Sequence, residues 1–115
     1  MTIKRNCYQI LLEDRFNDVI ISSEKGYHLV AFNNEEYALN KVYDDILEEV
    51  ANQFKEDMKC HRVDSSASKN LVSELGINSI PIVYIYKRGK VLKTLVGIYS
   101  KVYLTKTIAK IIKSR

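Results

Sequence analysis

Two cysteines and two histidines are the side chains of this sequence best suited to nucleophilic or metal chemistry. Cys60 lies in a predicted strand between Lys59 and His61, where a free cysteine commonly serves as a small buried apolar residue. No cation-lined helix terminus is predicted beside Cys60 to lower its thiol pKa. Cys7 precedes the first predicted strand as an exposed thiol, and His28 and His61 lack the spacings of zinc sites. We therefore expect no metal and no cofactor, and a lone reactive thiol remains the alternative to structural cysteines.

Composition and charge place the sequence among globular domains. Its 115 residues suit a single domain spanning residues 1–115, and 46% hydrophobic residues argue against a disordered chain. Two cysteines are too few for a disulfide-stapled scaffold. Charge is distributed unevenly, because residues 1–81 hold 9 basic and 14 acidic side chains, whereas residues 82–115 hold 9 basic and no acidic ones.

Apolar stretches are too short for a membrane span. The longest, residues 80–86, is interrupted by Pro81 and falls far short of the ~20 residues that a spanning helix needs. No apolar segment follows the basic amino terminus, as a signal peptide would require. The sequence therefore predicts no membrane association and a cytoplasmic location with reduced cysteines.

Hydrophobic periodicity predicts five strands and four helices. Their order alternates strand and helix before closing with a hairpin and a helix, which favours a mixed sheet covered on both faces. We therefore expect an α/β fold, a three-layer α/β/α sandwich with a central mixed five-stranded sheet. The strands are expected at residues 8–12, 27–32, 59–63, 80–86 and 90–96, and the helices after an Asp14 cap, at 35–54, at 68–75, and from a Ser100 cap to about 113.

This order and several motifs resemble the thioredoxin family over about residues 8–112. The most specific part is residues 76–91, GINSIPIVYIYKRGKV, where the family carries a G-[IV]-x-[SG]-[IV]-P-T segment followed by a strand, a K-x-G turn and a further strand. Residues 29–32, LVAF, match the central strand, and residues 45–51 match the long helix. The resemblance implies a thioredoxin fold with a cis Ile80–Pro81 bond beside a groove that pairs with extended peptide segments. Alternatively, Pro81 merely sets the start of its strand.

The family's active-site motif W-C-G-P-C is replaced by residues 36–40, EYALN. The family chemistry needs a thiolate at a helix amino terminus and a second thiol three residues later to resolve the mixed disulfide. Tyr37 and Asn40 can supply neither group. We therefore expect no catalytic residues and no disulfide reductase activity.

Further departures accompany the missing thiols. The family's buried acid in the central strand is Ala31 here, and its usual lysine partner falls at about Cys60. The family's proline within the long helix is replaced by Asp45, so the helix should continue without a kink. Strand one runs parallel to strand three in this fold, which should place Cys7 near the beginning of strand three and Cys60 further along. The two thiols are then expected to be too far apart for a disulfide.

The retained proline loop beside a dismantled dithiol site predicts a non-catalytic module that binds a protein or peptide. Tyr37 would be an exposed recognition anchor or, alternatively, would pack over the place of the missing disulfide. Other readings are a redox role through a lone thiol and a dimerisation or assembly domain. The predicted binding residues are Glu36, Tyr37, Ala38, Leu39, Asn40, Ser79, Ile80 and Pro81.

The basic carboxyl-terminal part allows two further interpretations. Lys106, Lys110 and Lys113 share one face of the last predicted helix, opposite an apolar stripe. No stacking aromatics alternate with these lysines, so we expect no nucleic-acid partner. Self-association between the acidic and basic faces into a homo-oligomer is an alternative to two simply solvated faces.

Overall fold

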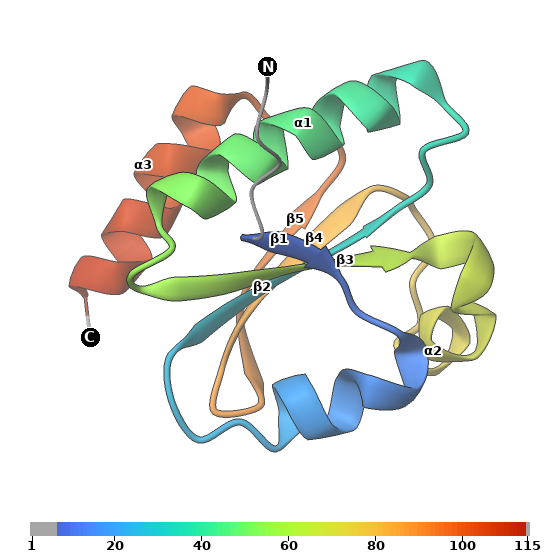
Figure 1. Cartoon of the computed structure of the whole chain (residues 1–115), viewed down its shortest axis with the longest axis horizontal. Helices are drawn as coiled ribbons and strands as arrows, with labels where there is room; N and C mark the ends of the chain where they lie inside the picture. Colours follow the sequence, from blue (N-terminus) through green and yellow to red (C-terminus); the bar gives the residue numbers. More distant parts are fainter. Residues whose placement is uncertain (1–6, 115) are drawn as a thin grey trace.

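The computed structural model describes residues 7–114 and contains a mixed five-stranded sheet with strand order β1-β3-β2-β4-β5 (Figure 1). β2 pairs in parallel with β3, which pairs in parallel with β1, while β4 runs antiparallel to β2 and to β5. None of the helices among residues 7–114 has the length and hydropathy to cross a membrane. The elements are β1 (Tyr8–Ile10), η1 (Glu13–Arg15), η2 (Asn17–Ile21), β2 (Tyr27–Asn33), α1 (Ala38–Gln53), β3 (Met58–Asp64), η3 (Ser65–Ala67), α2 (Lys69–Glu74), β4 (Ile82–Lys87), β5 (Lys90–Val96) and α3 (Lys101–Lys113).

Helices cover both faces of the sheet, which confirms the predicted three-layer architecture. α1 and α3 lie on one face, and η1, η2 and α2 lie on the other (Figure 1). Tyr43 and Leu104 belong to the first of two apolar clusters, Phe16 and Leu71 to the second. All seven residues of β2 are buried, because this strand is central and covered on both sides.

The first predicted helix differs from expectation. The segment forms a 3-10 turn, η1, followed by a single π-helical stretch, η2. Asp14 lies inside the 3-10 turn and does not cap a helix, because Leu12 occupies the capping position without a side-chain hydrogen bond. Phe16 and Ile20 of this segment are nevertheless buried in the core.

The long helix begins at Ala38, three residues later than predicted. Asn34 accepts a hydrogen bond from the Glu36 backbone N–H through its side-chain oxygen at 3.0 Å, which holds a turn that is not helical. Glu35 and Glu36 therefore precede α1, and the first turn of this helix contains no acidic residue. The helix continues through Asp45 to Gln53.

The carboxyl-terminal strand and helix agree closely with the sequence-based prediction. β5 has the predicted bounds, and the Ser100 Oγ accepts a hydrogen bond from the Tyr103 N–H at 3.1 Å as the cap of α3. The Ile80–Pro81 peptide bond is cis, and Pro81 precedes β4 instead of opening it. At the tip of the β4–β5 hairpin, Gly89 has φ +75° and packs so tightly on the Ile21 carbonyl that a Cβ there would collide with it.

Candidate functional site

A groove of about 790 Å³ opens at the amino end of α1 and brings the two predicted segments together. Residues 36–40 and Ile80 line it, whereas Ser79 and Pro81 lie beside Ile80 in the chain but do not line the groove. Ser65, which follows β3, and Ile98, which follows β5, complete the lining with Asn34. Sequence reasoning missed these last three residues, because only the sheet order brings their loops to this end of the molecule.

The groove has an exposed apolar rim. Tyr37 is 64% exposed, Leu39 is 71% exposed and Ile98 is 48% exposed. The alternative in which Tyr37 packs over the place of the missing disulfide therefore disagrees with the structure, because such a tyrosine would be buried. Asn40 is different, since it is only 9% exposed. The side chain of Tyr37 thus faces solvent, whereas that of Asn40 faces the protein interior.

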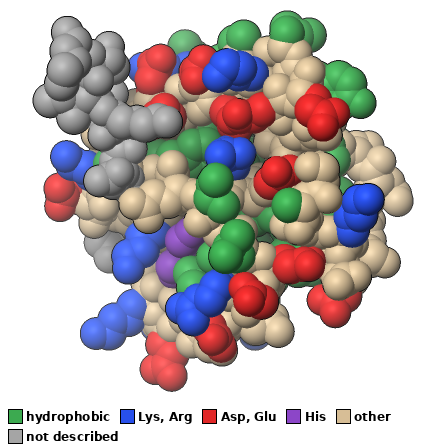
Figure 2. Space-filling model, turned by 45° about the vertical axis from the view of Figure 1, so that its right-hand side comes forward, with side chains coloured by type: hydrophobic (Ala, Val, Ile, Leu, Met, Phe, Trp, Pro, Cys, Tyr) green, Lys and Arg blue, Asp and Glu red, His purple; other side chains and the backbone are tan. Residues whose placement is uncertain are grey.

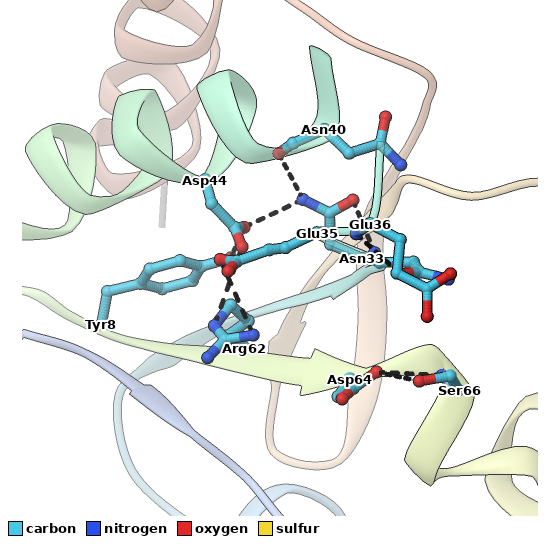
Figure 3. A network of polar contacts seen from close by, with 10 residues as sticks. Tyr8, Asn33, Glu35, Glu36, Asn40, Asp44, Arg62, Asp64 and Ser66 are labelled. Carbon is cyan, nitrogen blue, oxygen red and sulfur yellow. Dashed lines mark hydrogen bonds and ion pairs between the residues drawn. The ribbon is translucent and has the colours of Figure 1, made fainter. Parts of the chain in front are cut away.

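A buried polar network lies beneath this groove and was not predicted (Figure 3). Asn33 donates through its side-chain nitrogen to the Asn40 carbonyl at 2.9 Å and to Asp44 Oδ1 at 3.0 Å. The Tyr8 hydroxyl donates to the same Asp44 oxygen at 2.8 Å. The Asp44 carboxylate of α1 therefore accepts hydrogen bonds from β1 and β2. Asn33 also binds the Asn40 carbonyl in the first turn of α1.

Arg62 supplies the cation of this network. Its Nε lies 3.7 Å from Asp44 Oδ2, and its Nη1 lies 3.8 Å from Glu35 Oε2. In the β2–β3 register Ala31 stands opposite Arg62, and Leu29 stands opposite Cys60. α1 and the β2–α1 loop thus provide carboxylates to a cation on β3.

The two carboxyl groups of the network differ in acidity. Burial, followed by the neighbouring Glu35 carboxyl, raises the pKa of Asp44 to about 6, whereas the pKa of Glu35 is lowered, first by its interaction with Asp44. Asp44 is only 5% exposed. The helical spacing 40, 44, 47 and 51 was the signal that could have placed Asp44 on the buried face of α1.

The two cysteines are closer than the sequence suggested. Tyr8 pairs with Cys60 in the β1–β3 register, so Cys7 precedes the partner of Cys60 by one residue. Both cysteines line one cavity of about 360 Å³ and contact the core on the α1 side. The predicted wide separation is therefore wrong, because β1 begins opposite Cys60 and not earlier along β3. Both thiols are free.

Native thiol labelling should modify Cys7 alone. Cys60 is 4% exposed, and burial raises the pKa of its thiol to about 12, so its reactive thiolate is scarce at neutral pH. Cys7 is half-buried and accessible. We expect iodoacetamide to add one label per chain to the native protein and two after denaturation, measured by intact mass. A Cys7→Ser variant is the control and should remain unlabelled when folded, whereas rapid native labelling of Cys60 would contradict the prediction.

His28 and His61 form a stacked pair that the sequence did not reveal. The His28 Nδ1 lies 3.0 Å from the His61 Nε2, and the ring centroids are 5.3 Å apart. Ser23 donates to the Lys25 carbonyl, so we assign the His28 Nε2–H as donor to Ser23 and the His61 Nε2–H as donor to His28. Histidine side chains reach the surface beside basic side chains on the face in Figure 2. Within residues 7–114 no three His, Cys, Asp or Glu side chains are grouped to hold a metal ion.

Replacing His61 by glutamine should remove an acid-dependent loss of stability. Burial, then the His28 ring, lowers the pKa of His61 to about 4, whereas an unfolded histidine titrates near 6.5. The unfolded state therefore binds the proton first, and this group's contribution is complete above pH ~6.5 and lost as the pH falls towards 4. We expect wild type to lose about 2 kcal/mol relative to His61→Gln over this range. Urea unfolding at several pH values measures the difference, and a constant difference would contradict the prediction.

Comparison with known proteins gives the family. Residues 8–110 match the family model described as Thioredoxin. The chain is 30% identical over 98 residues to the chloroplastic thioredoxin M-type of Chlamydomonas reinhardtii, covering 85% of this chain and 69% of that protein. It is 35% identical over 68 residues to the thioredoxin of Griffithsia pacifica, covering 59% and 62% of the two chains. It is also 26% identical over 107 residues to the chloroplastic thioredoxin M-type of Pisum sativum, covering 93% and 62%. The last two alignments thus span less than two thirds of those relatives. This chain belongs to the thioredoxin family.

Proposed function

We propose that this thioredoxin-family chain is a non-catalytic module that binds an extended protein or peptide segment in the groove at the amino end of α1. The observation that carries the proposal is the apolar rim of this groove. Tyr37, Leu39 and Ile98 are exposed around it, and Ile80 lines it beside Pro81. An exposed tyrosine on such a concave surface is a typical anchor of protein interfaces, and the aliphatic side chains around it add apolar area.

The absence of thiols from the groove supports the non-catalytic part of the proposal. The sequence holds two cysteines, and both lie on the β1–β3 side of the sheet, away from the lining of the groove. Tyr37 occupies the position that precedes the first turn of α1, where the family chemistry needs a thiolate. Asn40 occupies the place of the resolving thiol. Disulfide exchange by the family mechanism has no nucleophile here.

Peptide selection followed by a matched substitution tests the binding role. Random linear peptides displayed on phage are selected on the immobilised full chain, and the selected peptides are measured by fluorescence anisotropy. We expect Tyr37→Ala to weaken their binding by about thirtyfold, as for the truncation of an aromatic anchor residue. Val102→Ala is the control, because Val102 is equally exposed on α3 outside the groove. Equal affinity for wild type and Tyr37→Ala, or a selection that yields no specific peptide, would contradict the proposal.

A further inference from the structure

β5 is the terminal strand of the sheet and has an open edge. It pairs with β4 on one side, and among residues 7–114 no strand lies on its other side. Six of its seven side chains are exposed. The backbone hydrogen bonds formed by turns, loops and caps in the described part of the chain involve none of residues 90–96. The outward N–H and C=O groups of β5 can therefore accept a further strand.

A groove of about 560 Å³ lies between this edge and α3. Its apolar part consists of Tyr103 and Ile111, and Tyr103 stacks on Tyr99 with ring centroids 4.9 Å apart. The cations around it are Lys93 of β5 and Lys106 and Lys110 of α3. The lining consists of Lys93, Tyr103, Lys106, Thr107, Lys110, Ile111 and Ser114.

The positive charge of the groove is not compensated within the described residues. No acidic residue follows Glu74 in the sequence, and the ion pair formed by the carboxyl-terminal part joins Lys101 to Glu49 at 2.9 Å. Across residues 7–114 no side-chain carboxylate lies within 4.0 Å of the groove lysines. An anionic ligand would therefore meet three unpaired ammonium groups beside an apolar surface.

We propose that the groove between β5 and α3 binds an acidic peptide segment, which adds as an extended strand along the β5 edge. The positive charge of β5 and of the groove favours an acidic peptide over a second copy of this chain. A second copy pairing through its own β5 would bring like charges together, because this strand carries Lys90 and Lys93. An acidic strand meets the opposite charge at the same edge, and main-chain hydrogen bonds supply the remaining affinity.

The register of β5 specifies the pattern of the peptide. Lys93 pairs with Ile85 and Leu95 with Val83, and both β4 partners belong to the core on the α3 side. Val96 pairs with Ile82, which belongs to the core on the opposite side. Because side chains alternate along a strand, carboxylates at every second position would face the groove lysines, and apolar residues between them would lie on the Val96 side.

Binding of an alternating Glu–Val peptide to the full chain tests the proposal. We expect saturable binding of the fluorescein-labelled peptide in anisotropy, and none of a Lys–Val peptide of equal length. Lys106→Glu/Lys110→Glu should weaken binding at least about tenfold. Lys55→Glu/Lys69→Glu carries the same charge change on other exposed lysines and should bind within about twofold of wild type. Lys106→Gln/Lys110→Gln, with thermal unfolding of each variant, separates lost binding from lost folding. Equal binding by the 106/110 and 55/69 variants would overturn the proposal.

Strand addition has its own test. A peptide with proline in place of the central valine keeps the charge but loses a backbone donor, so it should bind at least about tenfold more weakly. Amide resonances of residues 90–96 should shift on titration with the Glu–Val peptide, whereas those of residues 37–40 should not. If the proline peptide, or single-stranded oligothymidylate, binds as tightly as the Glu–Val peptide, the surface is a general anion-binding patch and the proposal is wrong.

Discussion

Replacing Asp44 by leucine is expected to lower the free energy of unfolding at pH 7 by about 3 kcal/mol. The substitution removes the acceptor of the Tyr8 hydroxyl and one of the two acceptors of the Asn33 side-chain amide, and it leaves Arg62 with Glu35 alone. These donors are buried or partly buried, so water cannot fully replace the lost carboxylate. Urea unfolding followed by circular dichroism measures the effect.

Asp44→Asn is the matched control. Its side-chain oxygen can still accept from Tyr8 and Asn33, and no charge has to be buried, so we expect its stability at pH 7 to be within about 1 kcal/mol of wild type. The pKa of Asp44 is raised to about 6 in the folded protein. Its contribution to stability is therefore fullest below the unfolded pKa, near 4, and is lost as the pH rises through 6. Relative to wild type, the asparagine variant should gain stability over this range. An asparagine variant as unstable as the leucine variant would contradict this account.

Asp44 and His61 act in opposite directions between pH 4 and 6. Acid favours the folded state through the raised pKa of Asp44 and disfavours it through the lowered pKa of His61. The wild-type profile is therefore flatter than that of either variant. The His61→Gln/Asp44→Asn double variant should show neither contribution.

Installing cysteines at positions 37 and 40 is expected to create disulfide reductase activity. Tyr37 precedes α1 and is exposed, Asn40 is buried one turn later, and the first turn of the helix holds no acidic residue. A thiol at position 37 would be acidified by the helix terminus and resolved by a thiol at position 40. With dithiothreitol as the reductant, Tyr37→Cys/Asn40→Cys should reduce insulin at least about tenfold faster than wild type.

The controls exclude a contribution from the native thiols. Tyr37→Cys/Asn40→Cys and the single variant Asn40→Cys are both made in a Cys7→Ser/Cys60→Ser background, and Asn40→Cys alone should show no gain in reductase activity. Loss of about 2 Da on oxidation of the double variant reports its disulfide. Turnover by wild type equal to that of the double variant would contradict both the expected gain and the non-catalytic function proposed for this chain.

Local signals predicted those elements whose ends depend on nearby residues. The start of β5 follows from the hairpin glycine Gly89. The start of α3 follows from the Ser100 hydroxyl, which accepts a hydrogen bond from the Tyr103 N–H three residues later. The predicted start of α1 is three residues too early, because the Asn34 side-chain oxygen accepts a hydrogen bond from the Glu36 backbone N–H and holds a turn there. A periodic pattern of apolar residues does not reveal such a turn.

Pairings across the sheet could not be read from the sequence in the same way. The distance between Cys7 and Cys60 depends on the register of β1 against β3. A shift of two residues in this register would separate the two cysteines. The burial of Asp44 follows from its helical spacing to Leu47, but its partners Tyr8 and Arg62 come from β1 and β3 and required the sheet order. The groove residues at the amino end of α1 were identified from the family resemblance, whereas Ser65 and Ile98 required the sheet order.

The complete burial of β2 has a consequence for amide hydrogen exchange. Its backbone is hydrogen-bonded to β3 on one side and to β4 on the other, and helices cover both of its faces. We therefore expect the amides of residues 29–32 to exchange with solvent only when the whole domain opens. Their protection factors should then give the global free energy of unfolding under native conditions, without denaturant and without extrapolation. In contrast, β1, a three-residue edge strand, should exchange through local opening.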